Sequence, residues 1–227
     1  MAQRPRLKIC GVTNVRDARL VSQSGADYCG ILAGVSFSER DLSLEQAREV
    51  AAACSIPVVI LLCDPAQERV EDVVREISPH AVQLLCRESP ELIRALRPRI
   101  GCEIWKTLHI PAVEGQASPE DYVSAGVDAF LLDSSDASEG FLRLGGTGTL
   151  VDWSRAAEAV RRISRPVFLA GGINPENVAD AVHQVRPHGI DLCSGVEQSR
   201  GRKDPDKVRR LVAVFSAAAA KLEESAR

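Results

Sequence analysis

The sequence predicts an α/β fold, a single-domain (β/α)8 barrel that spans residues 1–227. Eight short apolar runs alternate with helical segments, and successive runs start 21 to 39 residues apart. That spacing leaves room for one strand, one helix of about 10 residues and two turns, which is typical of parallel βαβ units. The eight expected strands are residues 7–10, 28–32, 57–62, 81–84, 103–108, 127–132, 166–170 and 189–193.

Four of the segments between these strands carry helix-capping signals. Ser43 is followed three residues later by Gln46, the capping-box pattern. Ser89 and Ser118 each precede a proline at the first helical position, and Asn174 repeats the pattern with an amide. We therefore expect helices to begin at these residues.

The number of strands favours a closed barrel over a doubly wound open sheet. A length of 227 residues is slightly below the roughly 250 of a typical barrel. An open sheet would carry a Gly-rich fingerprint after its first strand, and Cys10-Gly11-Val12 does not match it. No domain boundary is visible, so one domain is expected.

Composition indicates a soluble globular protein and disfavours several kinds of partner. Hydrophobic residues make up 45% of the chain, charged residues 26%, and the net charge is −3. Such a charge argues against nucleic acid and membrane as partners, and neither a bilayer span nor a signal peptide is expected. The seven cysteines form no C-x-x-C pair, so we expect reduced thiols in the cytoplasm, with no disulfide framework and no zinc site.

The active site of a barrel lies at the C-terminal ends of its strands. Cys10 ends the first expected strand and shares a face with Lys8, because side chains alternate along a strand. Asp133 ends the sixth, where a buried carboxyl costs free energy unless it is paired or functional. The alternatives are that Cys10 is a buried small apolar residue and that Asp133 caps a turn or helix.

Two glycine-rich turns follow the last two strands. Gly171 and Gly172 follow the seventh strand, and Ser194 and Gly195 follow the eighth. Glycine lets the backbone approach a ligand closely, and these two strand ends are the usual phosphate site of such barrels. The alternative is a pair of plain tight turns. A third glycine-rich segment, residues 145–148, is interpreted either as a ligand-binding turn or as a hinge.

Together these motifs resemble the phosphoribosylanthranilate isomerase family. The matching segments are Lys8-Ile-Cys-Gly11, Gly145-Gly-Thr-Gly148 with Asp152-Trp153, Leu169-Ala-Gly-Gly172 with Asn174-Pro-Glu-Asn177, and Ser194-Gly-Val-Glu197 with Lys203-Asp204. They occur in the family's order from residue 7 to about residue 215. The resemblance implies an Amadori rearrangement of N-(5-phosphoribosyl)anthranilate in tryptophan biosynthesis, with no cofactor and no metal.

The resemblance also implies roles for individual residues. Cys10 would be the general base and Asp133 the general acid, while Arg40 would hold the carboxylate of the anthranilate. The alternative for Arg40 is a solvated loop charge. Lys8 is a candidate to favour the thiolate of Cys10, and Lys106 is interpreted as a residue that can point into the barrel.

Several positions depart from the family pattern on the second to fourth strands. Leu85 and Cys86 replace the family's His and Gly, and the loop at residues 33–37 is one residue longer than usual. These changes fall where the aromatic half of the substrate would lie. Two alternatives therefore stay open: a diverged paralogue that isomerises another aminosugar phosphate, and a non-catalytic barrel that binds a sugar phosphate. In each case a phosphorylated small molecule is the expected partner, and the protein is expected to be a monomer or homodimer.

Overall fold

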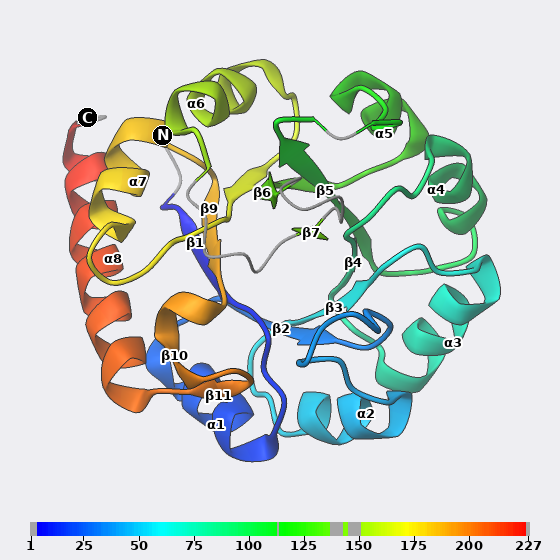
Figure 1. The fold of residues 1–227 in the computed structure, drawn as a ribbon, viewed down its shortest axis with the longest axis horizontal. Coiled ribbons are helices and arrows are strands. Elements are labelled where there is room, and N and C mark those ends of the chain that lie inside the picture. Colours follow the sequence, from blue (N-terminus) through cyan, green and yellow to red (C-terminus); the bar gives the residue numbers. More distant parts are fainter. Residues whose placement is uncertain (1–3, 113, 137–142, 145–150, 226–227) are drawn as a thin grey trace.

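The computed structural model describes residues 4–112, 114–136, 143–144 and 151–225. They form a closed barrel of eight parallel strands with helices around it, as the sequence predicts (Figure 1). Each barrel strand pairs with the next, and the last pairs with the first. The barrel strands are β1 (Arg6–Ile9), β2 (Tyr28–Leu32), β3 (Val58–Leu62), β4 (Ala81–Leu84), β5 (Glu103–Ile110), β6 (Ala129–Asp136), β8 (Val167–Leu169) and β9 (Gly189–Leu192).

The helices cover the outside of the barrel and begin largely where the capping signals predict. Ser43 closes a capping box, and the hydroxyl groups of Ser89 and Ser118 accept hydrogen bonds from the backbone of their first turns. Among the described residues, no helix combines the length and apolarity that crossing a bilayer requires. The helices are α1 (Val15–Ser24), α2 (Leu44–Ala52), α3 (Gln67–Ile77), α4 (Pro90–Leu96), α5 (Pro119–Ala125), α6 (Trp153–Arg162), α7 (Val178–Val185) and α8 (Pro205–Ser225).

The prediction that a helix begins at Asn174 is wrong. Helix α7 begins at Val178, and Asn174 instead closes a turn, because its side-chain oxygen accepts hydrogen bonds from the backbone N–H groups of Glu176 and Asn177. Asn174 therefore caps the turn that precedes α7 rather than the helix itself.

Four short elements at the C-terminal rim were not predicted. Strand β6 runs beyond its expected end and pairs antiparallel with β7 (Arg143–Leu144). After β9 the chain forms a 3-10 turn, η2 (Ser194–Val196), and a small ribbon of β10 (Glu197–Ser199) and β11 (Arg202–Lys203). The glycine-rich segment at 145–148 lies outside the described residues.

The barrel interior combines aromatic rings with buried polar side chains. Trp105 stacks on Phe168 with ring centroids 4.8 Å apart and meets Tyr28 edge-on at 5.2 Å. Four buried polar residues alternate along their strands with residues of the outer apolar core, so they face inward. They are Lys8, Gln83, Thr107 and Asp191.

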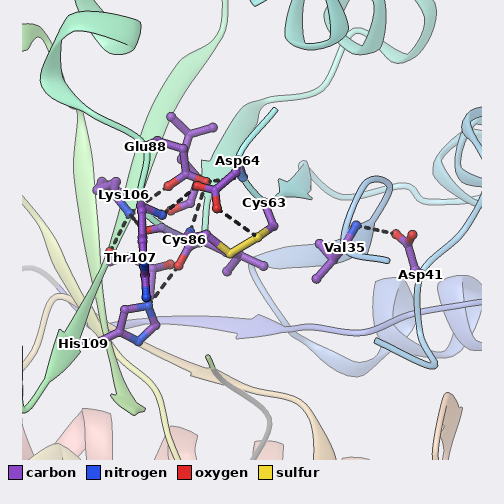
Figure 2. Close-up of a disulfide and its surroundings, with 12 residues drawn as sticks. Val35, Asp41, Cys63, Asp64, Cys86, Glu88, Lys106, Thr107 and His109 are labelled. Atoms are coloured by element: carbon purple, nitrogen blue, oxygen red, sulfur yellow. Dashed lines mark hydrogen bonds and ion pairs between the residues drawn. A yellow bond between two sulfur atoms is a disulfide. The ribbon is translucent and has the colours of Figure 1, made fainter. Parts of the chain in front are cut away.

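The interpretation that Lys106 points into the barrel is wrong. Lys106 alternates with Trp105 and shares the outer face of β5 with Ile104 and Leu108. There its ammonium group pairs with the carboxylate of Glu88 at 3.0 Å, and both side chains are fully buried. The Lys106 ammonium also donates to three backbone carbonyl groups, those of Leu84 and Cys86 at and just after the end of β4 and that of Thr107 on β5 itself (Figure 2).

Removing the Lys106 charge is expected to destabilise the fold. The Lys106→Met variant leaves the buried Glu88 carboxylate without its cation, which typically costs about 3–5 kcal/mol. Chemical denaturation at neutral pH measures this difference in unfolding free energy. The matched control is Arg94→Met, which breaks an exposed pair with Glu91 and should cost less than about 1 kcal/mol. Equal losses in the two variants would contradict the expectation.

The expectation of reduced thiols throughout is wrong for one pair, because Cys63 and Cys86 form a disulfide (Figure 2). They lie 23 positions apart in sequence, but the parallel pairing of β3 with β4 brings their Cα atoms to 5.1 Å. Glu88 holds the same junction together, since one oxygen of its carboxylate accepts hydrogen bonds from the backbone of both Asp64 and Cys86.

Candidate active site

Cys10 lies directly after β1 at the C-terminal rim, as predicted. Its backbone N–H still donates to Leu192 across the β1–β9 seam at 2.8 Å. The thiol packs against the backbone of Gly30, where a Cβ atom would come within 2.8 Å of the sulfur. Burial raises the pKa of the Cys10 thiol to about 12, and the nearby Lys8 ammonium opposes this shift. In the unliganded protein at neutral pH, Cys10 is therefore a thiol.

Asp133 lies one residue beyond the last pair of the β6–β8 ladder, Leu132 with Leu169. One oxygen of its carboxyl group accepts a hydrogen bond from the Ser134 backbone at 2.8 Å. Burial raises the pKa of Asp133 to about 7. The group therefore exchanges a proton near neutral pH, as a general acid at that pH requires.

A buried ion pair lies close enough to influence both groups. The Lys8 ammonium contacts the Asp191 carboxylate at 2.9 Å, because the two residues stand opposite each other on β1 and β9. The Lys8 charge acts to lower the pKa values of both Cys10 and Asp133, and the Asp191 charge acts to raise them. Thiol, carboxyl and ion pair thus form one electrostatic unit. Sequence reasoning missed Asp191, although an acidic residue inside an apolar strand was the available signal.

The two predicted glycine turns lie side by side. A Cβ atom on Gly195 would overlap the backbone carbonyl of Ile173 and come within 2.9 Å of the Asn174 Cα atom. Gly171 and Gly172 both adopt positive φ angles, 81° and 67°, which favour glycine. The Asp133 carboxyl borders the first of these turns, since a Cβ on Gly171 would lie 3.1 Å from its oxygen.

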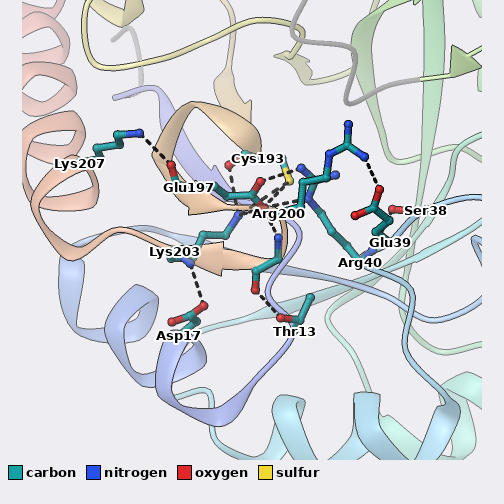
Figure 3. Close-up of polar contacts among 11 residues, drawn as sticks. Thr13, Asp17, Ser38, Glu39, Arg40, Cys193, Glu197, Arg200, Lys203 and Lys207 are labelled. Atoms are coloured by element: carbon teal, nitrogen blue, oxygen red, sulfur yellow. Dashed lines mark hydrogen bonds and ion pairs between the residues drawn. The ribbon is translucent and has the colours of Figure 1, made fainter.

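Arg40 reaches the same rim from the loop after β2, as predicted, but it has a protein partner. Its guanidinium group donates two parallel hydrogen bonds to the carboxylate of Glu197, at 2.8 and 2.6 Å (Figure 3). The Arg40 side chain crosses Gly11, where a Cβ would come within 2.8 Å of the Arg40 Cδ atom. Glu197 belongs to the segment that matches the family motif, but the sequence alone indicates no role for it.

The fold and this site define a (β/α)8 barrel that carries a buried thiol and a buried carboxyl group beside a double glycine turn. Within that class, the chain belongs to the N-(5'-phosphoribosyl)anthranilate isomerase family, whose sequence model matches residues 7–214. The predicted family resemblance is thereby confirmed.

Individual relatives cover nearly the whole chain. An N-(5'-phosphoribosyl)anthranilate isomerase of Methanocella arvoryzae is 36% identical over 210 residues, which is 91% of this chain and 96% of the relative. The crystal structure of the Thermus thermophilus phosphoribosyl anthranilate isomerase is 32% identical with a TM-score of 0.77, covering 93% of this chain and 98% of that one. Another such isomerase was solved in complex with reduced 1-(o-carboxyphenylamino)-1-deoxyribulose 5-phosphate. It is 30% identical with a TM-score of 0.75, covering 94% of this chain and 99% of that one.

Proposed function

We propose that this protein isomerises N-(5-phosphoribosyl)anthranilate to 1-(2-carboxyphenylamino)-1-deoxyribulose 5-phosphate in tryptophan biosynthesis. The observation that carries the proposal is the electrostatic unit at the rim, in which Asp133 and Cys10 flank the Lys8–Asp191 ion pair beside the glycine turns. Family membership and the relative solved with a reduced product support the substrate. The reaction is an aldose–ketose type isomerisation in the cytoplasm.

The first step of the proposed mechanism opens the furanose ring. Protonated Asp133 donates its proton to the ring oxygen as the bond between that oxygen and C1 breaks. The lone pair of the aniline nitrogen forms a C=N bond, which gives a cationic Schiff base. A carboxyl with a pKa of about 7 suits this step, because about half of it is protonated at neutral pH.

The second step moves a proton from C2 of the sugar. Once Cys10 has lost its thiol proton to solvent, its thiolate removes the C2 proton, a C1=C2 double bond forms, and the π electrons of the C=N bond return to nitrogen. The resulting enol loses its hydroxyl proton and gains one at C1, which yields the ketone. These steps are proton transfers and one C–O cleavage, so we propose that no cofactor and no metal take part.

The substrate's two anionic ends fit two different parts of the rim. We place its phosphate on the backbone of Gly171, Gly172, Ser194 and Gly195, and its carboxylate on Arg40. Arginine binds planar carboxylates with paired hydrogen bonds, and glycine turns allow close backbone approach. The phosphate end would then lie beside Asp133 and the carboxylate end beside Cys10.

Crowding the phosphate turns is expected to weaken substrate binding. In Gly195→Ala the new methyl group overlaps the Ile173 carbonyl and pushes the two turns apart, so KM should rise roughly tenfold or more. Steady-state kinetics and inhibition by inorganic phosphate measure the effect. Gly101→Ala is the control, because its Cβ would have no neighbour within 4 Å. An unchanged phosphate inhibition constant in Gly195→Ala would place the phosphate elsewhere.

The experiment that tests the function is a direct conversion assay. Purified protein is supplied with freshly generated N-(5-phosphoribosyl)anthranilate, and the aminoketone product is separated from its isomer by chromatography. Complementation of a tryptophan auxotroph that lacks this step gives the matching result in cells. If folded protein binds the substrate but forms no product, the non-catalytic alternative is favoured. Turnover of only a different aminosugar phosphate would favour the paralogue.

The oligomeric state, monomer or homodimer, stays a prediction.

A further inference from the structure

Glu197 is the centre of a buried charge cluster at the rim (Figure 3). Its side chain is 5% exposed and pairs with two cations, the guanidinium group of Arg40 and the ammonium group of Lys203. Lys203 is fully buried and lies 3.2 Å from the carboxylate. Although burial acts to raise the pKa of Glu197, the hydrogen bonds from these cations hold it below its usual value. The carboxylate is therefore ionised at neutral pH, and the cluster carries one excess positive charge.

The ribbon of β10 and β11 fixes Glu197 independently of Arg40. Glu197 stands opposite Lys203 in the ribbon. The backbone N–H of Gly201 donates to the Glu197 carboxylate oxygen that also pairs with the Lys203 ammonium group. The ribbon is in turn tied to α1, because the Lys203 backbone donates to the Asp17 carboxylate at 2.9 Å. The Glu197 carboxylate thus has a fixed position, and the longer Arg40 side chain is aligned against it.

The pairing geometry leaves one specific edge of Arg40 for a ligand. A guanidinium group offers two edges that bind a carboxylate in parallel, one through Nε and Nη2 and one through Nη1 and Nη2. Glu197 occupies the first edge. Across the part of the chain that the structure describes, the second edge has no hydrogen-bond partner. The Arg40 stem crosses Gly11, the residue after Cys10, and the Arg40 charge is close enough to interact electrostatically with the Cys10 thiol.

We infer that Glu197 is a positioning residue, which orients Arg40 so that its free edge receives the carboxylate of the substrate. This inference rests on the proposed function and extends it from Arg40 to the residue that aligns it. Without Glu197, Arg40 would sample many rotamers and lose its selectivity for a planar carboxylate.

The test compares two ligands that differ only in the carboxylate. Reduced 1-(o-carboxyphenylamino)-1-deoxyribulose 5-phosphate carries it, and the phenylamino counterpart lacks it. Calorimetry gives the dissociation constants of both for wild type, Glu197→Gln and Glu39→Gln. Glu39→Gln is the matched control, because Glu39 forms an exposed ion pair with Arg200 beside the same cluster. Because Glu197→Gln leaves two buried cations uncompensated, the double variant Glu197→Gln with Lys203→Met is measured as well.

We expect Glu197→Gln to weaken the carboxylate ligand roughly 10- to 100-fold while the phenylamino ligand changes less than about threefold. In an Arg40→Met background, the same change should have less than about a threefold effect on either ligand, because Glu197 acts through Arg40. For the substrate, KM should rise and kcat should change little. Equal weakening of both ligands, or an undiminished effect without Arg40, would overturn the inference. Because the binding assay needs no turnover, a wild type that fails to convert substrate would refute the proposed function separately.

Discussion

The Asp133→Asn variant is expected to lose about two to four orders of magnitude in kcat, because general acid catalysis typically contributes that much. Asparagine has nearly the same shape and still accepts the hydrogen bond that the Ser134 backbone donates to Asp133. It has no proton to give to the furanose oxygen. The Kd of the reduced product should therefore stay within about threefold of wild type. Steady-state kinetics and calorimetry measure the two quantities.

The titration of Asp133 can be followed directly by infrared spectroscopy. Burial raises its pKa to about 7, so the band of a protonated carboxyl should persist from acid pH up to neutrality and disappear above it. An ordinary aspartate would be ionised from about pH 4 upward. Between about pH 5 and pH 7, where ordinary carboxyl groups are ionised, Asp133→Asn should lack the contribution of this carboxyl to the band. If Asp133→Asn keeps more than about a tenth of the wild-type kcat, Asp133 is not the general acid.

The Cys10→Ala variant is expected to lose a similar two to four orders of magnitude in kcat. The substitution removes only the sulfur atom of Cys10, which lies after the end of β1 and packs against Gly30, so the cavity left behind is small. Folding and ligand binding should therefore persist. Cys102→Ala is the matched control, because that half-buried cysteine precedes β5 at the opposite end of the barrel. Retention of wild-type kcat by Cys10→Ala would place the base elsewhere.

The charge state of Cys10 shows what the substrate must contribute. With pKa values of about 12 and about 7, a thiolate and a protonated Asp133 coexist in at most roughly one molecule in 10⁵, since each pKa unit is a factor of ten. Ring opening supplies a cationic Schiff base, and a positive charge nearby lowers the pKa of a thiol. In the proposed mechanism, Cys10 therefore becomes a competent base in the intermediate rather than in the unliganded protein.

The barrel and the places of Cys10 and Asp133 at its rim were predictable because both follow from local patterns. The alternation of apolar runs and helices defines the eight units, and the strand-end rule then selects Cys10 and Asp133. Lys106 was misassigned although alternation along β5 assigns it to the outer face, opposite to Trp105. That error came from considering the residue apart from its strand neighbours.

The missed features depend on contacts between segments that are distant in sequence. Asp191 has a role only because closure pairs β9 with β1, which brings it to Lys8 across 183 positions. Glu197 pairs with Arg40, which lies 157 positions away in the sequence, because the β10–β11 ribbon holds Glu197 at the rim. No apolar run in the sequence predicts that ribbon. The disulfide was rejected on cysteine spacing along the chain, whereas the relevant distance is between the ends of two adjacent strands.

The sulfur–sulfur link between β3 and β4 also restricts the motions of the segment that it encloses. It turns residues 63–86, with helix α3 inside them, into a covalent ring. Tying such a loop removes conformational freedom from the denatured chain, a contribution of about 3 kcal/mol in the chain-entropy description. The segment can lose its hydrogen bonds transiently, but its two ends stay linked. The native hydrogen bonds therefore reform quickly, because few alternative conformations are accessible. Fluctuations of this segment should therefore be small and short-lived.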